Sequence, residues 1–199
     1  MNRHPSVLAR MAATLQQASG GRLILGIGIG GHPAEHEALG IPFPSVGERV
    51  ARLEEAVAVI RALWTGGPVT RPGRFYPLED AYAFPRPEPP PPIIVGGETR
   101  AGARLAARIG DGWTAFEETF ERDEPLYRET LARLGRDRAA MTVHVGFQRG
   151  LREPLAGGGW ARDPRGTFDS WRARGADGAI VTARTKEDVD ALVDAAERW

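Results

Sequence analysis

Short apolar runs alternate with amphipathic helical segments along this chain of 199 residues. Strands that are apolar on both faces occur in parallel sheets that helices cover. Regular alternation of such strands with helices favours a mostly parallel sheet. The sequence therefore predicts an α/β fold with outer helices and five parallel strands, near residues 23–28, 93–95, 113–116, 142–147 and 179–182.

The helical segments have clear start signals. Pro5 suits the first position of a helix, Ser45 and Glu48 have capping-box spacing, and Thr185 can cap the last helix. A further helix is predicted over residues 126–134. The residues expected to face inward are Leu8, Met11, Ala12 and Leu15 in the first helix, Val50, Leu53, Val57, Ile60 and Trp64 in the second, and Val189, Leu192, Val193 and Ala196 in the last.

The remaining segments are predicted to be loops within one domain. Glycine and proline are frequent over residues 65–92, where a hairpin at 68–84 is expected as an excursion from the main sheet. Residues 150–165 also read as a loop. The proline run at 89–92 precedes a strand directly, so it is interpreted as a rigid lead-in rather than a linker, and residues 1–199 are predicted to form a single domain.

Charge and cysteine content exclude several classes of function. Lysine plus arginine and aspartate plus glutamate number 26 each, which leaves no basic surface for nucleic acid or an anionic membrane. The chain has no cysteine, so disulfides and thiolate metal sites are excluded. It has no membrane-length apolar run and no signal-peptide core. We therefore expect a soluble cytoplasmic protein with a small-molecule ligand.

The glycine-rich segment Gly26–Gly31 follows the first predicted strand and matches G-x-G-x-x-G. A dinucleotide fold would require a helix immediately afterwards and an acidic residue at the end of a second strand. Pro33 and the helix that Ser45 caps occupy those places, so this interpretation is disfavoured. The glycines instead indicate either close backbone packing or a loop against a flat cofactor at the mouth of a barrel.

His32, Glu35 and His36 match H-x-x-E-H, a zinc peptidase spacing that requires both histidines on one helical face. Pro33 and the preceding glycines argue against a helix there, so we predict that the two histidines bind no structural metal. The histidines could lie on the loop surface, or one of them could face a substrate pocket.

The segment Gly96-Gly97-Glu98-Thr99 lies between a buried strand and a helix. Backbone N–H groups at a helix start attract anions, and Thr99 could add a hydroxyl. A plain helix start, with glycine for the turn and threonine for the cap, is the other interpretation. Because ligands bind at the carboxyl ends of strands in such folds, we predict an anion site here. Gly97→Asp is expected to weaken binding more than folding.

Taken together, several segments resemble the luciferase-like monooxygenase family, which includes enzymes that use the deazaflavin coenzyme F-420 (hereafter F420). The resemblance covers residues 5–116 in the family's order. The segments that carry it are Ala18–Gly28, Glu37–Phe43, the Arg49–Trp64 helix with its Leu-Trp-Thr-Gly ending, Phe75–Leu78, Pro91–Gly97 and Leu105–Trp113.

The resemblance implies a partial TIM-type (β/α)8 barrel, with about five of the eight strand–helix units present and the first strands missing. It implies an oxidoreductase that uses FMN or F420 for hydride transfer or monooxygenation of a small organic substrate. Gly96, Gly97 and Thr99 would hold the cofactor phosphate, with Glu98 in the same turn. Gly28 and Gly30 would lie beside the ring system.

Two departures from the family pattern limit what the resemblance implies. Gly31 and His32 stand where some F420 dehydrogenases have a glutamate acid, so no catalytic residue is carried over, and the sugar-phosphate dehydrogenase subgroup is disfavoured. Five strands would leave the barrel unclosed, so we expect marginal stability or self-association. A homo-oligomer is therefore among the expected states. A non-catalytic remnant of such an enzyme and a zinc hydrolase are the alternative functions.

Overall fold

The computed structural model describes residues 3–147, 155 and 158–198, and the chain forms two compact units, residues 1–93 and 94–199. The prediction of a single domain over residues 1–199 stays a prediction. In the first unit the elements are α1 (Pro5–Ala18), β1 (Leu25–Ile27), α2 (Pro33–Ala38), α3 (Val46–Leu63), β2 (Val69–Arg71) and β3 (Leu78–Ala81). β4 (Ile93–Gly96) begins at the last residue of this unit.

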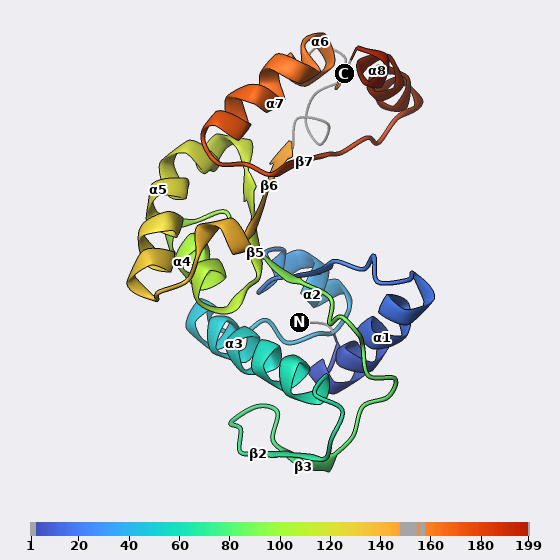
Figure 1. Cartoon of the computed structure of the whole chain (residues 1–199), viewed down its shortest axis with the longest axis vertical. Coiled ribbons are helices and arrows are strands. Elements are labelled where there is room, and N and C mark those ends of the chain that lie inside the picture. Colours follow the sequence, from blue (N-terminus) through green and yellow to red (C-terminus); the bar gives the residue numbers. More distant parts are fainter. Residues whose placement is uncertain (1–2, 148–154, 156–157, 199) are drawn as a thin grey trace. The chain divides into compact units, whose positions relative to one another are not determined.

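The elements of the second unit continue the alternation of strands and helices (Figure 1). They are α4 (Arg100–Ile109), β5 (Gly112–Phe116), α5 (Glu117–Arg133), the 3-10 turn η1 (Arg138–Ala140), β6 (Thr142–Phe147), α6 (Gly159–Arg162), α7 (Pro164–Ala173), β7 (Gly178–Val181) and α8 (Lys186–Glu197). Among these described residues, no helix has both the length and the apolar character that crossing a membrane requires.

In the first unit, α1 packs against α3 through small residues. Ala9, Ala12 and Ala13 are buried, and the indole Nε1–H of Trp64 donates to the Ala9 carbonyl at 2.9 Å. The predicted inward face of α1 is partly wrong, because Met11 and Leu15 are exposed. The alanines allow a close approach of the two helix backbones, and this contact turns the larger side chains outward.

A buried glutamine positions β1 and the proline run. The Gln16 side chain donates to the Pro89 carbonyl at 2.8 Å and accepts the N–H of Leu23 at 3.0 Å. Leu25 then donates to the Pro92 carbonyl at 2.9 Å. These bonds satisfy the buried amide and hold the start of β1 beside the segment that leads into β4.

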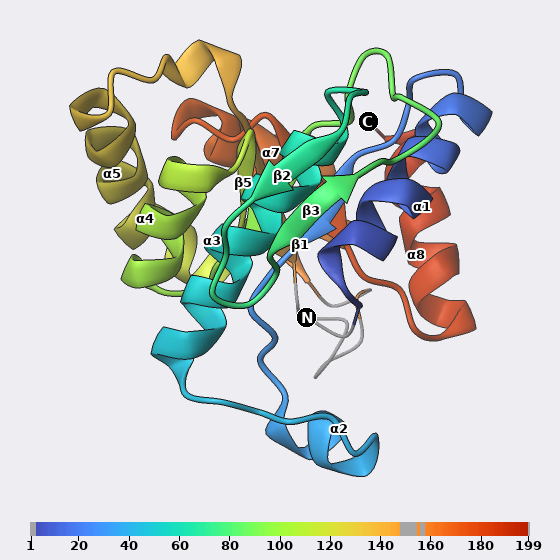
Figure 2. The ribbon, with the colours of Figure 1, turned by 90° about the horizontal axis from the view of Figure 1, so that it is seen from below.

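β2 and β3 form the expected hairpin, and they pair antiparallel (Figure 2). The Glu55 carboxylate on α3 accepts the N–H groups of Phe75 and Tyr76, at distances from 2.7 to 3.1 Å. A Cβ at Gly73 would lie 2.1 Å from a carboxylate oxygen of Glu55, so a larger residue there would displace this carboxylate. Glu55 thereby fixes the position of Tyr76.

In the second unit β4, β5, β6 and β7 pair in that order and all three pairings are parallel. α4 and α5 lie side by side (Figure 1). Trp113 on β5 is fully buried and stacks on Tyr127 of α5, with ring centroids 5.1 Å apart. The predicted strands agree with β1 and β4–β7 to within two residues at each end.

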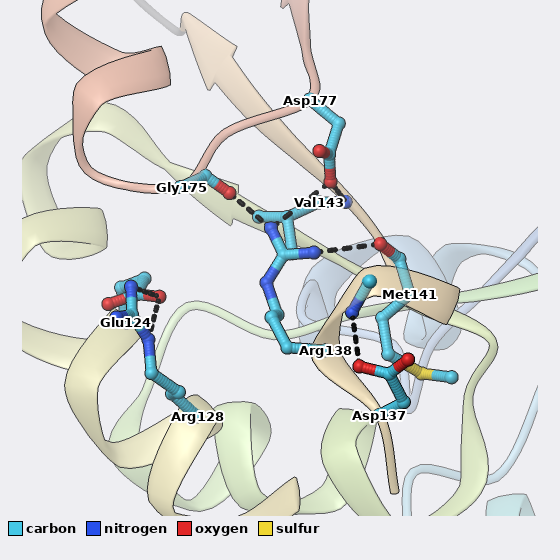
Figure 3. A network of polar contacts seen from close by, with 9 residues as sticks. Glu124, Arg128, Asp137, Arg138, Met141, Val143, Gly175 and Asp177 are labelled. Carbon is cyan, nitrogen blue, oxygen red and sulfur yellow. Dashed lines mark hydrogen bonds and ion pairs between the residues drawn. The ribbon is translucent and has the colours of Figure 1, made fainter.

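Arg138 connects the segments that precede β6 and β7, at the end of the sheet where these strands begin. Arg138 donates to the carbonyls of Met141 and Gly175 and pairs with Asp177 at 3.1 Å, as Figure 3 shows. Asp177 also accepts the N–H of Val143, at 2.8 Å. In barrel folds this end of the sheet serves stability rather than chemistry.

Three helix predictions in the second unit need correction. α5 begins at Glu117 rather than near 126, and it carries Pro125 within it. α6 lies inside the stretch predicted as a loop over 150–165, of which 150–154 and 156–157 fall outside the described residues. Val189 and Val193 of α8 are exposed, because Asp188 and Ala195 face inward instead.

Candidate functional site at the strand–helix turn of residues 96–99

The turn between β4 and α4 carries the predicted anion site. Thr99 is the N-cap of α4, and its hydroxyl oxygen accepts the N–H of Gly102 at 3.1 Å. That bond leaves the hydroxyl proton available, and Thr99, Glu98 and Gly96 are exposed. The N–H groups of Arg100 and Ala101, in the first turn, have no intrahelical acceptor. The turn therefore presents donors and the positive end of a helix dipole to solvent.

Gly97 has a structural role in the turn, and its predicted role in cofactor binding stays a prediction. Its N–H donates to the Thr114 carbonyl at 3.1 Å, so it is not offered to a ligand. A Cβ at Gly97 would lie 2.7 Å from the backbone of Gly102, and one at Gly102 would lie 2.8 Å from Gly97. Gly97→Asp would therefore disturb the fold, which makes the expected separation of binding from folding wrong for this change.

The core of the second unit supports the same turn. The indole Nε1–H of Trp113 donates to the Gly97 carbonyl at 2.9 Å. Together with the bond from Gly97 to Thr114, this fixes both polar backbone groups of Gly97. A turn held at both groups can keep its donors oriented before a ligand arrives, which is what anion binding at a helix start requires.

Gly28 and Gly30 follow β1 in the first unit. Gly30 has a φ of +78°, a left-handed conformation that favours glycine, and a Cβ there would lie 3.1 Å from the imidazole Cε1 of His36. The glycine at 30 thus lets the chain turn directly against the His36 ring. The role of both glycines beside a cofactor ring stays a prediction.

The H-x-x-E-H segment does form a helix, contrary to the sequence-based argument. α2 begins at Pro33, which is a favoured first helical residue, and His32 is its N-cap. His36 is buried, and its Nδ1 lies 3.0 Å from the His32 carbonyl oxygen. The residues that the structure describes contain no group of three His, Asp or Glu side chains arranged to hold a metal.

His36 lines a pocket, as the sequence analysis allowed for one of the two histidines, but the other residues of the lining were not predicted. Arg49 and Arg52 on α3 and Tyr76 from the hairpin lie in the same lining. The hydrogen bonds that Arg52 makes to Glu48, and then to Tyr76, raise the pKa of Arg52 above its ordinary value. The only local signal was a pair of arginines three residues apart near the start of α3, and such pairs usually face solvent.

Comparisons with known proteins identify the family of this chain. The profile of the luciferase-like monooxygenase family matches residues 1–153. F420-dependent glucose-6-phosphate dehydrogenases from Beutenbergia cavernae and Kineococcus radiotolerans are 41% and 42% identical over 128 residues. Each match covers 64% of this chain and 37% of the relative, so the chain spans little more than a third of their length. By name these relatives belong to the sugar-phosphate dehydrogenase subgroup. The sequence disfavoured that subgroup, because Gly31 and His32 stand in place of its glutamate acid.

Solved structures show the same fold. The F420-dependent tetrahydromethanopterin reductase from Methanopyrus kandleri superposes with a TM-score of 0.75 at 19% identity, over 97% of this chain and 78% of that one. An F420-dependent secondary alcohol dehydrogenase superposes with a TM-score of 0.69 at 23% identity, over 99% and 67%. The predicted partial TIM-type barrel is thereby confirmed, and the chain belongs to the luciferase-like monooxygenase family.

Proposed function

We propose that this protein is an oxidoreductase that binds F420 or FMN and acts on a small organic substrate. The observation that carries the proposal is the turn at Gly96–Thr99, where a helix start and a free hydroxyl meet at the carboxyl end of a parallel strand. Family membership supports the reaction class, and the F420-dependent relatives favour F420 over FMN.

The residues of the turn fit the phosphate of such a cofactor. Thr99 can donate its hydroxyl proton, and Arg100 and Ala101 can donate backbone N–H groups, while Trp113 keeps Gly97 in place. Glu98 is exposed and belongs to the turn through its backbone. When bound, the cofactor would supply the hydride or oxygen chemistry, and the chain would hold and orient it.

The first test compares two helix caps within the second unit. Thr99→Ala and Thr185→Ala each remove an N-cap hydroxyl, so each is expected to lower the stability of its helix by about 1 kcal/mol. Only Thr99→Ala should also weaken F420 binding, by roughly tenfold, because a hydrogen bond to a charged group is lost. Titration of cofactor fluorescence measures this difference, and Thr99→Ser should restore affinity.

Equal cofactor affinity in the two alanine variants would contradict the phosphate site. Absence of any F420 or FMN binding by the folded chain would instead favour the non-catalytic remnant. The described residues offer no metal cluster that would support the zinc hydrolase.

Glucose 6-phosphate is the first substrate to assay, because the relatives from Beutenbergia cavernae and Kineococcus radiotolerans are named as glucose-6-phosphate dehydrogenases. When bound, F420 would supply the acceptor for the hydride and proton lost by the sugar, so loss of the absorption of oxidised F420 on addition of glucose 6-phosphate is the expected result. Reduction with other alcohols but not with glucose 6-phosphate would move the proposal to another substrate within the same family. The cytoplasmic location stays a prediction.

A further inference from the structure

A pocket of about 190 Å3 lies in the first unit, and its lining contains none of the residues used in the proposed function. Its polar side chains come from α2, α3 and the hairpin segment, and they are His36, Glu48, Arg49, Arg52 and Tyr76; Pro44 lines it from the loop before α3. Pockets for whole drug-sized ligands measure about 300–1,000 Å3, so this one suits a single small group of a ligand.

Arg49 is the side chain that this pocket leaves least satisfied. One terminal nitrogen donates to the Pro44 carbonyl at 2.6 Å, while the buried Nε–H has no acceptor within the part of the chain that the structure describes. No carboxylate among the described residues pairs with this guanidinium. A partly buried arginine without a counter-charge is unfavourable by itself, and a bound anion would relieve that cost.

Arg52 gives the pocket its second cation, and Glu48 neutralises only one of the two. The Glu48 carboxylate lies 2.8 Å from Arg52, and it faces this arginine rather than closing the predicted capping box with Ser45. Two guanidinium groups and one carboxylate leave a net positive pocket beside the start of α3, where the helix dipole adds attraction for an anion.

Aromatic rings hold the two arginines in position. The Arg49 guanidinium lies 3.8 Å from the centroid of the Phe43 ring, and Phe43 packs edge-on against His36. Arg52 lies 4.6 Å from the ring of Phe75. Stacked guanidinium groups keep their planes fixed and their in-plane donors free, so little ordering would remain when a ligand binds.

We propose that this pocket binds the phosphate group of a small molecule. Guanidinium donors match phosphate oxygens in geometry and charge, and the size of the pocket admits one such group. The proposal goes beyond the cofactor assignment and does not rest on it, because all its residues belong to the first unit and Gly96–Thr99 take no part. Binding should therefore occur with no cofactor present.

The test follows histidine ring signals by NMR while inorganic phosphate is added to the full chain at constant ionic strength. The chain has four histidines, of which His36 lines the pocket and His144 lies on β6 in the other unit. We expect the His36 signal to shift and saturate while the His144 signal stays in place. A second titration with glucose 6-phosphate, with glucose as its control, asks whether a sugar adds affinity.

Three variants should change the phosphate affinity in three different ways. Arg49→Gln should weaken phosphate binding at least about tenfold, because a charged donor is lost. Glu48→Gln should strengthen it, because the only carboxylate in the lining disappears. Arg10→Gln, which removes an exposed arginine of the same unit, should leave it unchanged. If Arg49→Gln unfolds, Arg49→Lys keeps the charge and should bind with intermediate affinity.

Tighter binding of glucose 6-phosphate than of phosphate would support a sugar phosphate as the occupant, and equal binding would support phosphate recognition alone. An unmoved His36 signal at high phosphate would overturn the proposal. So would equal affinities in the Arg49, Glu48 and Arg10 variants. Loss of cofactor binding in Thr99→Ala with an unchanged His36 titration would show that the two sites are separate.

Discussion

Tyr127 is a residue whose ring and hydroxyl have opposite effects on stability. The ring is fully buried and stacks on Trp113, which stabilises the core of the second unit. The hydroxyl is buried and has no hydrogen-bond partner among residues 3–147, 155 and 158–198, and burial raises the pKa of Tyr127 to about 12. A hydroxyl with no partner lowers stability, because it has lost its bonds to water.

Tyr127→Phe should therefore leave stability unchanged or raise it by about 1 kcal/mol at neutral pH. The folded pKa lies above the unfolded value near 10, so in the wild type stability is retained below pH 10 and lost as the pH rises toward 12. The variant should lack this part of the alkaline loss. Thermal melting from pH 8 to 12 measures it, with the exposed Tyr82→Phe as control. A destabilised variant at pH 7 would mean that the hydroxyl has a partner.

At the same scale, the sequence indicated the turn at Gly96–Thr99 as a candidate site, and of the pocket it indicated only that one histidine could line it. The turn at Gly96–Thr99 is contiguous, so its strand, glycines and cap can be read together. The pocket around Arg49 joins His36 and Tyr76 to α3 from both sides in the sequence. No local pattern encodes that meeting, because it depends on how α2 and the hairpin return to one helix.

At the scale of elements, strands were easier to predict than helix faces. β4 and β5 are short apolar runs with glycine beside them, and this pattern can be recognised in the local sequence without knowledge of the packing partners. The buried face of α1 depends on its neighbour, and alanines that contact α3 replaced the expected Met11 and Leu15. α2 was missed because Pro33 was weighed as a helix breaker although it stands at the first helical position.

The start of α8 gives an element with a specific acid sensitivity. Asp188 accepts N–H groups of Leu155, Arg184 and Thr185 at 2.8, 3.0 and 3.2 Å, and these bonds lower its pKa, that of Leu155 most. Thr185 in turn accepts the Asp188 N–H, which completes the capping box. Because the folded pKa is depressed, this stabilisation is present above the unfolded value near 4 and lost as the pH falls through the folded value.

Asp188→Asn should accordingly lower the melting temperature at pH 7, and the gap from the wild type should narrow as the pH falls below about 4. Asp190→Asn on the same helix is the control, because its pair with Lys186 is exposed and should matter little. Melting curves between pH 2 and 7 give the comparison. A gap that stays constant over this range would show that the charge of Asp188 is not the cause.

At the scale of the whole molecule, the unexpected feature is the apolar surface on α1. Val7, Met11 and Leu15 are exposed by 52%, 43% and 54%, and their spacing of four residues places them in one stripe. Monomeric proteins rarely keep such neighbouring apolar side chains in water. The stripe is therefore the part of the first unit that we expect to mediate self-association.

Sedimentation velocity over a range of concentrations should show association of the wild type and its reduction in a Met11→Lys, Leu15→Glu double variant. Leu39→Lys, at an exposed leucine outside the stripe, should change nothing. The free energy of unfolding of the double variant should stay within about 1 kcal/mol of the wild-type value, because surface substitutions change stability little. A wild type that stays monomeric at high concentration would contradict the expectation of self-association.

The contact between Gly97 and Gly102 has a consequence for engineering the turn that is proposed to hold the cofactor phosphate. With backbone atoms 2.7 to 2.8 Å from any added Cβ, both positions admit only glycine, whatever ligand the turn holds. In a saturation library over residues 96–102, most members would carry a side chain at position 97 or 102 that disrupts the fold. Randomising positions 96, 98 and 99 while keeping 97 and 102 fixed would confine the search to side chains that are free to vary.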